Sequence, residues 1–208
     1  MMPEPHETLL YLVRHGATPA NEQRPYVLQG RGIDTSLSNT GQQQAAAVAE
    51  FLADRPLDAV ISSPMKRARE TADAIAQPHQ ITASVLDNIS ECDVGRWEGR
   101  DWDSIMQDDA EAYSRFIDNP GIHGYPDGES YQDVLDRVGT PIDNLLATHR
   151  GQTVALVAHN IVNRVYLARL MGWPISSRKI SSSDSRDVAR RISSTASGMV
   201  MKKRVTSG

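Results

Sequence analysis

The chain has 208 residues, a length that favours one α/β domain over two small ones. Of its residues 39% are hydrophobic and 23% charged, an ordinary balance for a globular protein. Its one cysteine, Cys92, cannot form an internal disulfide, which fits a reducing, cytoplasmic setting. No run of about 18 apolar residues exists and the first residues lack a basic signal region, so we expect no membrane association.

Charge is distributed unevenly along the chain. Residues 175–208 carry eight Lys or Arg and two Asp, a net charge of +6, whereas residues 1–174 carry 14 basic and 24 acidic residues, a net charge of −10. An acidic body lacks the basic surface of a nucleic-acid-binding protein, so no nucleic-acid partner is expected. We therefore divide the chain into a domain at 1–174 and an atypical Ser- and base-rich tail at 175–208.

The first elements along the chain alternate between strand and helix. Residues 9–13 form a short apolar run, which predicts a strand covered on both faces. A helix follows, because Ser38 can cap it and its apolar residues share one face: Ala45, Val48, Ala49 and Leu52. Residues 59–62 predict a second buried strand.

The next helix should begin with Ser63 as its N-cap and Pro64 as its first residue, a combination common at helix starts. Residues 81–86 predict a third strand. Residues 134–146 then show the apolar spacing of a long helix, which Pro141 should kink.

The last elements complete the alternation. Residues 153–158 predict a fourth buried strand, and residues 161–171 predict an apolar helix that Gly172 ends. Strands that alternate with helices predict a mostly parallel sheet with helices on both faces. The expected fold class is α/β, a three-layer α/β/α sandwich.

The tail at 175–208 breaks this pattern. It holds ten Ser and eight basic residues without strand periodicity, so we expect a loosely held or disordered extension. One explanation is a basic tail that docks on an acidic partner. We favour another, a change of reading frame near residue 176 that leaves a sheet edge exposed, because pattern and composition change together there.

Two histidines follow buried strands. His15 lies in Arg14-His15-Gly16 directly after the first strand, and His159-Asn160 directly follow the fourth. Open α/β sheets bind ligands at the carboxyl edge, so neighbouring strands would bring both imidazoles and Arg14 to one crevice. Either histidine alone could be a hydrogen-bonded residue at the end of a strand, but the pair favours a site.

Several ordered motifs resemble the histidine phosphatase superfamily, also called the phosphoglycerate-mutase-like family, over most of residues 9–174. They are Arg14 to Thr18 with Asn21; Gln29-Gly30 with Asp34, Leu37, Ser38, Gly41 and Ala45; Ser62-Ser63-Pro64 with Arg67, Glu70, Thr71 and Ala72; Glu91 with Gly95, Trp97, Glu98 and Gly99; Pro126, Gly128, Glu129 and Ser130 with Arg137; and His159. The chain departs from the pattern at Asn160, where many members have glycine.

The resemblance implies a covalent mechanism. His15 would attack phosphorus and carry a phosphohistidine, Glu91 would donate the proton to the leaving group, and His159 would add a hydrogen-bond donor. The remaining phosphate- or substrate-binding residues implied are Arg14, Gly16, Thr18, Asn21, Gln29, Gly30, Arg67 and Asn160. Guanidinium groups match phosphate oxygens, and imidazole is largely neutral at pH 7. No residues have metal-ligand spacing, and neither a metal nor a cofactor is expected.

The preferred interpretation is a metal-independent phosphatase acting on a small phosphorylated substrate. A phosphoglycerate mutase is the alternative, although residues 100–125 hold only Arg100 and Arg115 against six acidic residues, which disfavours a second phosphate. A catalytically inactive phosphate- or partner-binding module is the second alternative. Arg24, Arg31 and His123 are weaker candidates for substrate contact. The sequence leaves the exact substrate and a homodimer open.

Overall fold

The computed structural model describes residues 3–175 and 200–206, apart from the side chains of residues 200–204. A five-stranded sheet in the order β3-β2-β4-β1-β5 forms the middle of the molecule. The strands are β1 (Glu7–Arg14), β2 (Ala59–Ser62), β3 (Ser84–Val85), β4 (Thr153–Ala158) and β5 (Val200–Thr206). The first four run parallel to one another, and β5 pairs antiparallel with β1.

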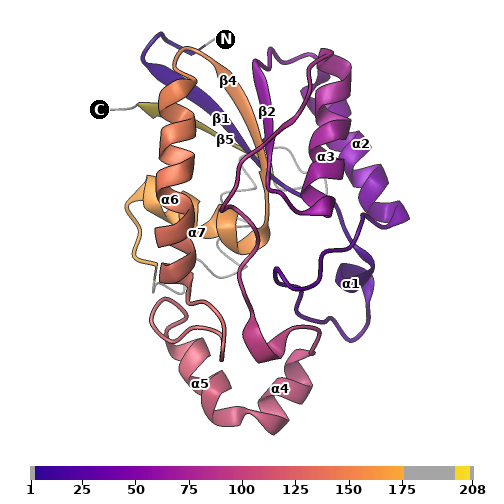
Figure 1. Ribbon diagram of the computed structural model, residues 1–208, viewed down its shortest axis with the longest axis vertical. Coiled ribbons are helices and arrows are strands. Elements are labelled where there is room, and N and C mark those ends of the chain that lie inside the picture. Colours follow the sequence, from indigo (N-terminus) through magenta and orange to yellow (C-terminus); the bar gives the residue numbers. More distant parts are fainter. Residues whose placement is uncertain (1–2, 176–199, 207–208) are drawn as a thin grey trace.

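Helices cover both faces of the sheet, as Figure 1 shows. The helices α2 (Asn39–Ala53) and α3 (Lys66–Ala76) pack on one face, and α6 (Tyr131–Thr148) and α7 (Asn160–Met171) pack on the other. The other helical elements are α1 (Pro19–Glu22), η1 (Gln77–His79), η2 (Gly95–Trp97), α4 (Trp102–Asp108) and α5 (Ala110–Asp118). The predicted three-layer α/β fold is confirmed.

The central strands are buried on both faces because each face meets a helical layer. In β1, Leu10 and Leu12 belong to the core under α6 and α7, whereas Leu9, Tyr11 and Val13 belong to the core under α2 and α3. These five side chains are at most 4% exposed. A strand covered on both sides therefore reads as a continuous apolar run, which is why residues 9–13 were recognisable.

Helix ends follow the expected capping in two of three places. The Ser38 side chain accepts a hydrogen bond from the Gly41 N–H at the start of α2, and Gly172 ends α7 in the left-handed conformation. The expectation of Ser63 and Pro64 at the start of a helix is wrong, because α3 begins at Lys66 with Met65 as its N-cap. The helix α6 continues through Pro141.

The sheet edges differ from the sequence prediction. The strand expected at residues 81–86 is reduced to the two residues of β3. The expectation that the tail holds no strand is wrong, because β5 pairs with β1 from Thr206 opposite Glu7 to Val200 opposite Val13, so β1 is not an edge of the sheet. Backbone hydrogen bonds can hold such an edge strand although three consecutive basic residues interrupt its apolar pattern. The rest of the predicted disordered tail, residues 176–199 and 207–208, lies outside the described residues.

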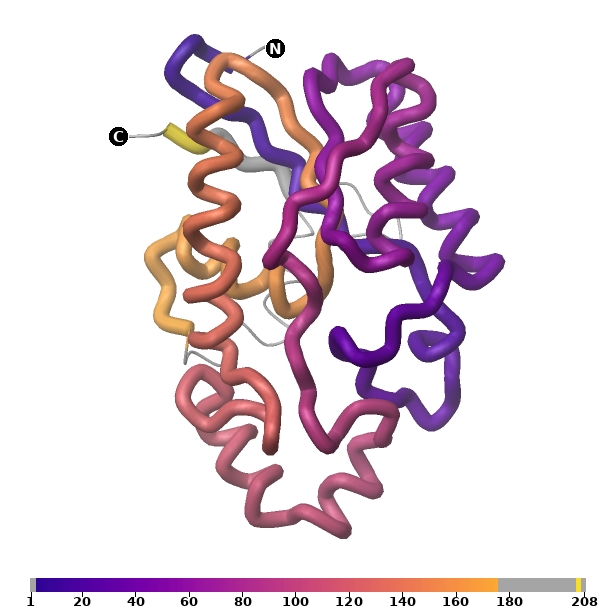
Figure 2. Tube along the Cα trace, viewed as in Figure 1, coloured from indigo at the N-terminus to yellow at the C-terminus, as the bar shows by residue number. Residues whose placement is uncertain are grey.

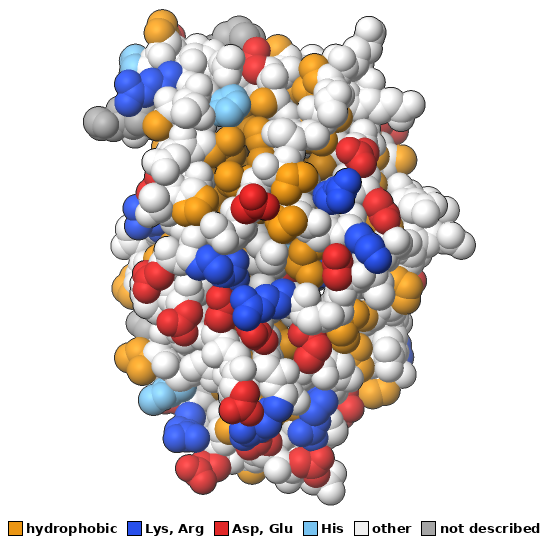
Figure 3. Space-filling model, in the orientation of Figure 1, with side chains coloured by type: hydrophobic (Ala, Val, Ile, Leu, Met, Phe, Trp, Pro, Cys, Tyr) orange, Lys and Arg blue, Asp and Glu red, His pale blue; other side chains and the backbone are white. Residues whose placement is uncertain are grey.

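Two long connections lie beyond the carboxyl ends of the parallel strands. Residues 15–38 follow β1 and residues 86–130, which include α4 and α5, follow β3 (Figure 2). Acidic and basic side chains are interspersed over this part of the surface (Figure 3). Some of these side chains form ion pairs, such as Arg96 with Asp109 at 2.8 Å and Arg100 with Asp108 at 2.6 Å. These connections form the space in which the functional side chains meet.

Tight backbone contact fixes the connection after β1 against α2. A Cβ atom at Gly41 would lie 1.9 Å from the Ala17 carbonyl oxygen, and one at Gly16 would lie 2.3 Å from the Gly41 carbonyl oxygen. Both distances are far below van der Waals contact, and the obstacles are backbone atoms. Glycine is therefore required at both positions because the loop and the helix touch, not because of backbone dihedral angles.

We predict that Gly41→Ala lowers the free energy of unfolding by about 1–3 kcal/mol, because backbone must move to admit the methyl group. Denaturant unfolding of the purified chain measures this loss. Gly139→Ala in α6 is the matched control, since its Cβ would meet only ordinary contacts, 3.8 Å from Arg169. Alanine also favours a helix interior, so the control should be neutral or stabilising. Equal destabilisation by both substitutions would contradict the proposed clash.

Candidate active site

The two histidines meet at the carboxyl edge of the sheet. β1 and β4 are neighbours, with Arg14 opposite Ala158, so the next residues of the two strands emerge side by side. The His15 N–H donates to the Ala158 carbonyl at 3.1 Å. The ring centroids of His15 and His159 lie 5.1 Å apart, with the planes at 58°. Strand register thus brings together the pair that the sequence singled out.

The contacts of His15 specify its protonation. Its Nδ1 lies 2.7 Å from the Gly16 carbonyl oxygen, which can only accept, so Nδ1 carries the proton. Its Nε2 lies 3.2 Å from the Arg67 Nε–H, which can only donate, so Nε2 holds the lone pair. Burial, with Arg67 and Arg14 nearby, lowers the pKa of His15 from 6.5 to about 3. The imidazole is therefore neutral at pH 7, with Nε2 available as a nucleophile.

His159 is held from behind by a serine. Its Nε2 lies 2.7 Å from the Ser63 hydroxyl, and Ser63 follows directly on β2, the other neighbour of β4. The Ser63 oxygen also accepts from the Met65 N–H at 3.3 Å, and the hydroxyl can still either donate to His159 or accept from it. The His159 Nδ1 is buried and has no partner among the described residues. Burial and the neighbouring His15 lower the pKa of His159 well below its usual value.

Arg67 is buried at 1% exposure in the first turn of α3. Besides its bond to His15, its guanidinium donates to the Ile33 carbonyl at 2.9 Å and to the Gly30 carbonyl at 3.1 Å. The loop after β1 therefore fixes the position of this cation against the imidazole. Neither Arg67 nor His159 lines the cavity described below, since both lie deeper in the protein than His15.

Glu91 is a buried carboxyl group beside the start of α7. Its Oε1 accepts from the Cys92 N–H at 2.9 Å and its Oε2 faces the Ile161 N–H at 3.4 Å. Burial raises the pKa of Glu91, and these amides and Arg67 only partly oppose that shift. A carboxyl group with a raised pKa retains its proton at a higher pH, as a general acid must.

Two side chains that the sequence did not place in the site hold the Glu91 segment in position. Arg137 donates to the carbonyls of Asn88 and Ser90, and it pairs with Glu129 at 2.8 Å. Glu129 in turn accepts from the Asp93 N–H at 2.8 Å. These bonds tie both sides of Glu91 to α6. The sequence placed Arg137 and Glu129 in motifs but gave no sign of what they contact.

Three of the predicted binding residues form a polar network at the start of α1. Thr18 donates from its hydroxyl to the Gln29 side-chain oxygen at 2.6 Å, and Asn21 donates to the same oxygen at 3.3 Å. The Gln29 amide nitrogen donates to the Ile33 carbonyl at 3.0 Å. Thr18 is fully buried, so its contacts are structural, whereas Asn21 and Gln29 line the cavity.

The predicted binding glycines serve backbone packing. Gly16 packs directly against α2, and its carbonyl oxygen accepts the hydrogen bond from His15 Nδ1–H. Gly30 sits where a Cβ would lie 2.5 Å from the Cys92 carbonyl oxygen, and its N–H donates to Glu98 at 2.6 Å. Glu98 also accepts from the Gly32 N–H at 3.2 Å, so it anchors the loop that carries Gly30.

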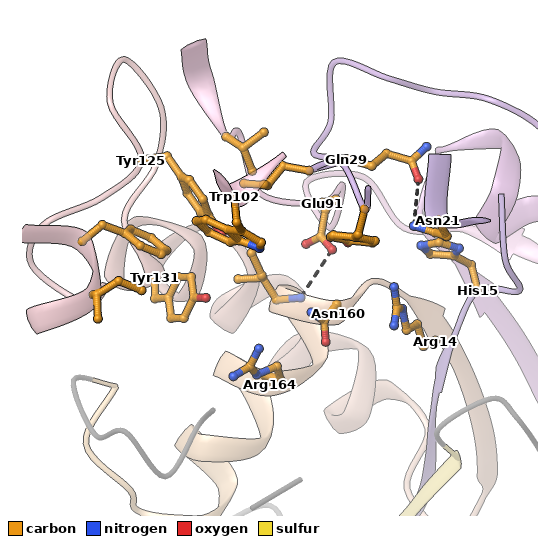
Figure 4. Close-up of a pocket in the computed structure, with 16 residues that line it drawn as sticks. Arg14, His15, Asn21, Gln29, Glu91, Trp102, Tyr125, Tyr131, Asn160 and Arg164 are labelled. Carbon is orange, nitrogen blue, oxygen red and sulfur yellow. Dashed lines mark hydrogen bonds between the residues drawn. The ribbon is translucent and has the colours of Figure 1, made fainter. Parts of the chain in front are cut away.

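A cavity of about 470 Å³ opens in front of these groups. Arg14 and His15 from the end of β1, Asn160 from the start of α7, and Asn21, Gln29 and Glu91 from the two connections line it, as Figure 4 shows. Its other walls are formed by Tyr26, Leu28, Val94, Trp102, Phe116, Ile117, Tyr125, Tyr131, Ile161 and Arg164. The Arg14 Nε is buried here without a partner among the described residues. Such a donor suits an anion at this end of the cavity.

The sequence missed Arg164. It lies on α7 one turn after Asn160, and this i to i+4 spacing is the signal that could have placed it in the same crevice. The weaker candidates lie elsewhere. His123 lines a separate cavity with Arg96 and Arg115, Arg31 pairs with Asp93 at 2.7 Å, and the Arg24 side chain donates to nearby main-chain carbonyls.

No group of His, Cys, Asp and Glu in the part of the chain that the structure describes is arranged to hold a metal ion. Among the described helices, none combines the length and apolar character that a membrane span requires.

The fold thus brings two histidines, an arginine and a buried carboxyl group to one cavity at the carboxyl edge of a parallel sheet, the usual place for a ligand site in this fold class. Comparison with known proteins agrees. The model of the histidine phosphatase superfamily (branch 1) matches residues 10–197, past the boundary drawn at residue 174. The chain therefore belongs to the histidine phosphatase superfamily.

Three relatives illustrate the likeness. The "Bifunctional protein Rv2228c" of Mycobacterium tuberculosis is 39% identical over 153 residues, which are 73% of this chain but 41% of that protein. "Phosphoserine phosphatase 1" of Hydrogenobacter thermophilus is 33% identical, covering 80% and 78% of the two chains. The solved structure of Bacillus stearothermophilus YhfR superposes with a TM-score of 0.75 at 31% identity, covering 84% of each chain. Other matches are named as an adenosylcobalamin/alpha-ribazole phosphatase and a probable phosphoglycerate mutase.

The buried neutral histidines predict acid sensitivity. Between pH 6.5 and about 3 the unfolded chain binds a proton at His15 that the folded protein excludes, so stability falls as the pH falls. We predict that His15→Asn, which cannot bind this proton, reduces the slope of unfolding free energy against pH by about 1.4 kcal/mol per pH unit in this window. Urea unfolding at a series of pH values measures the slope. The exposed His6 supplies the control His6→Asn, and an unchanged slope in His15→Asn would contradict the prediction.

Proposed function

We propose that this protein is a metal-independent phosphatase that hydrolyses a small phosphate monoester through a phosphohistidine on His15. The observation that carries the proposal is the fixed tautomer of His15, whose Nε2 lone pair is directed to Arg67 by a proton on Nδ1. Membership of a superfamily with relatives named as phosphatases supports it.

The first displacement uses groups from both sides of the cavity. The substrate phosphate would draw hydrogen bonds from Arg14 and Arg67, which frees the His15 Nε2 from its Arg67 partner. The Nε2 lone pair forms a bond to phosphorus as the bond from phosphorus to the ester oxygen breaks. That oxygen takes the proton of Glu91, because an alkoxide is a poor leaving group. His159 lies behind His15, and its unpaired Nδ1, if it carries the ring proton, would donate to the phosphoryl oxygens once the phosphate is seated against both rings.

The second displacement regenerates the protein. Glu91, now a carboxylate, accepts a proton from water as the water oxygen attacks phosphorus. The bond between phosphorus and His15 breaks, and its electron pair returns to Nε2. One ester and one water become one alcohol and one phosphate, so a single carboxyl group serves first as acid and then as base.

A phosphoglycerate mutase is the alternative, since a relative named as a probable phosphoglycerate mutase matches 79% of this chain at 33% identity. A mutase must hold a second phosphate while the substrate reorients. In residues 86–130, Arg96 and Arg100 already pair with aspartates, and Arg115 faces the separate cavity. The described lining cations are Arg14 and Arg164, which favours hydrolysis.

We predict that His15→Ala abolishes turnover of every active ester in a screen of phosphate monoesters run with and without a chelator. The variant should also form no phosphoenzyme, which is trapped in the wild type by rapid alkaline denaturation with labelled substrate. His123→Ala is the control, because His123 is exposed in the separate cavity. Normal activity of a folded His15→Ala would refute the mechanism. Phosphate binding without any turnover in the wild type would indicate an inactive module, and isomerisation of phosphoglycerate would indicate a mutase.

Glu91→Gln should separate substrates by leaving group. We expect kcat/KM for an alkyl phosphate to fall by about 10²–10⁴, and that for p-nitrophenyl phosphate by less than about tenfold, because a nitrophenolate needs little protonation. In the wild type, kcat/KM for the alkyl ester should decline as the pH rises through the raised pKa of Glu91, and the variant should lose this limb. Asp93→Asn is the matched control, since Asp93 pairs with Arg31. Equal losses on both substrates would exclude Glu91 as the acid.

A further inference from the structure

The cavity has two chemically different ends. His15, Arg14 and Asn21 stand at the sheet edge, where the phosphate would bind. The far end is formed by aromatic rings of residues 102–131, and Arg164 lies between Tyr131 and Asn160 (Figure 4). Its volume of about 470 Å³ falls in the range of sites for small organic ligands, well beyond the needs of a phosphate group. The far end therefore has room for the alcohol part of a substrate.

Arg164 is the distinctive charged group of the far end. Its Nε is buried and has no hydrogen-bond partner among the residues that the structure describes. The Arg14 Nε, at the end proposed to bind the phosphate, is likewise buried without a hydrogen-bond partner among those residues. Buried polar groups are normally paired, so an unpaired donor on a residue that lines a cavity calls for a partner, which a ligand atom or a water can supply. By contrast, Arg169 on the same helix pairs with Asp143 at 2.6 Å.

Aromatic rings surround the far end. Phe116, Tyr125 and Tyr131 contact one another and Trp102 contacts Phe116, with centroid distances between 4.4 and 6.5 Å. Flat rings accommodate a flat apolar ligand at little entropic cost. Burial raises the pKa of Tyr131 and the charge of Arg164 opposes that shift, so the cation acts across this end of the cavity. An anion beside Arg164 would be attracted more strongly there than in water.

We propose that Arg164 and the aromatic end form a subsite for the alcohol part of the substrate, and that this part is a flat apolar group that carries a carboxylate. The proposal rests on the phosphatase function proposed above. One planar guanidinium matches one carboxylate through two parallel hydrogen bonds. A second phosphate, with two charges, would call for more cations than the described residues place at this end.

The test uses the full chain and two esters of equal shape, 3-carboxyphenyl phosphate and 3-carbamoylphenyl phosphate. They differ in the charge of one substituent, so the ratio of their kcat/KM values reports recognition of the carboxylate. Wild type should prefer the carboxylate ester, and Arg164→Met should reduce the ratio by at least roughly tenfold, because the loss of even one of the two hydrogen bonds to a charged group has about this effect. Arg164→Lys, which keeps the charge but not the planar fork, should retain part of the preference.

The outcomes separate this proposal from the proposed function. Arg169→Met, which removes an arginine from the same helix outside the cavity, should keep the wild-type ratio. If both esters are hydrolysed in a His15-dependent manner but the ratio is unchanged in Arg164→Met, the subsite is overturned and the phosphatase stands. An equal loss of kcat/KM on both esters would likewise overturn the subsite, because Arg164 would then not distinguish the carboxylate. Thermal unfolding of Arg164→Met would show whether such a loss comes from a less stable fold. If neither ester nor any other is hydrolysed, the phosphatase itself fails.

Discussion

The parallel pairing of β1 with β4 is the constraint on which the rest of the site depends. Because Arg14 lies opposite Ala158, the residues that follow, His15 and His159, leave the sheet at the same level with ring centroids 5.1 Å apart. Backbone hydrogen bonds in a buried sheet fix this separation more firmly than a surface loop would. β2 adds Ser63 behind His159, so three adjacent strands position the two imidazoles.

Burial shifts the protonation of the histidines and of Glu91 in the direction that the proposed mechanism requires. The same desolvation lowers the pKa of His15 and His159 and raises that of Glu91, which favours a neutral nucleophile beside a protonated acid. Main-chain groups offset part of the cost of burying these polar side chains. The Gly16 carbonyl accepts a hydrogen bond from His15, and the Cys92 N–H donates one to Glu91. The protein thus holds these groups in place before any ligand arrives.

Different parts of the fold supply the polar groups of the cavity and its aromatic wall. The sheet edge carries the two histidines and Arg14, which strand register holds in place, and the start of α3 carries Arg67. The connection at residues 86–130 contributes Glu91 and the aromatic wall, and the ion pair of Arg137 with Glu129 ties it to α6. Changes in that connection can alter the wall without moving the histidines, which suits a superfamily whose named members act on different phosphate esters.

The sequence by itself determined the central strands, the helices of both layers and the two histidines, because doubly covered strands and amphipathic helices impose their periods on the chain. It did not determine β5, since an edge strand held by backbone bonds tolerates basic residues that erase the apolar pattern. It also placed Ser63 in a helix cap, whereas the fold places Ser63 against His159, 96 positions away. The spacing of Arg164 from Asn160 puts both on one face of α7, but only the fold shows that this face lines the cavity. Local sequence patterns indicate whether one face of a helix or strand is buried. Which distant residues share a cavity depends on strand order and helix packing, and only the tertiary structure decided these.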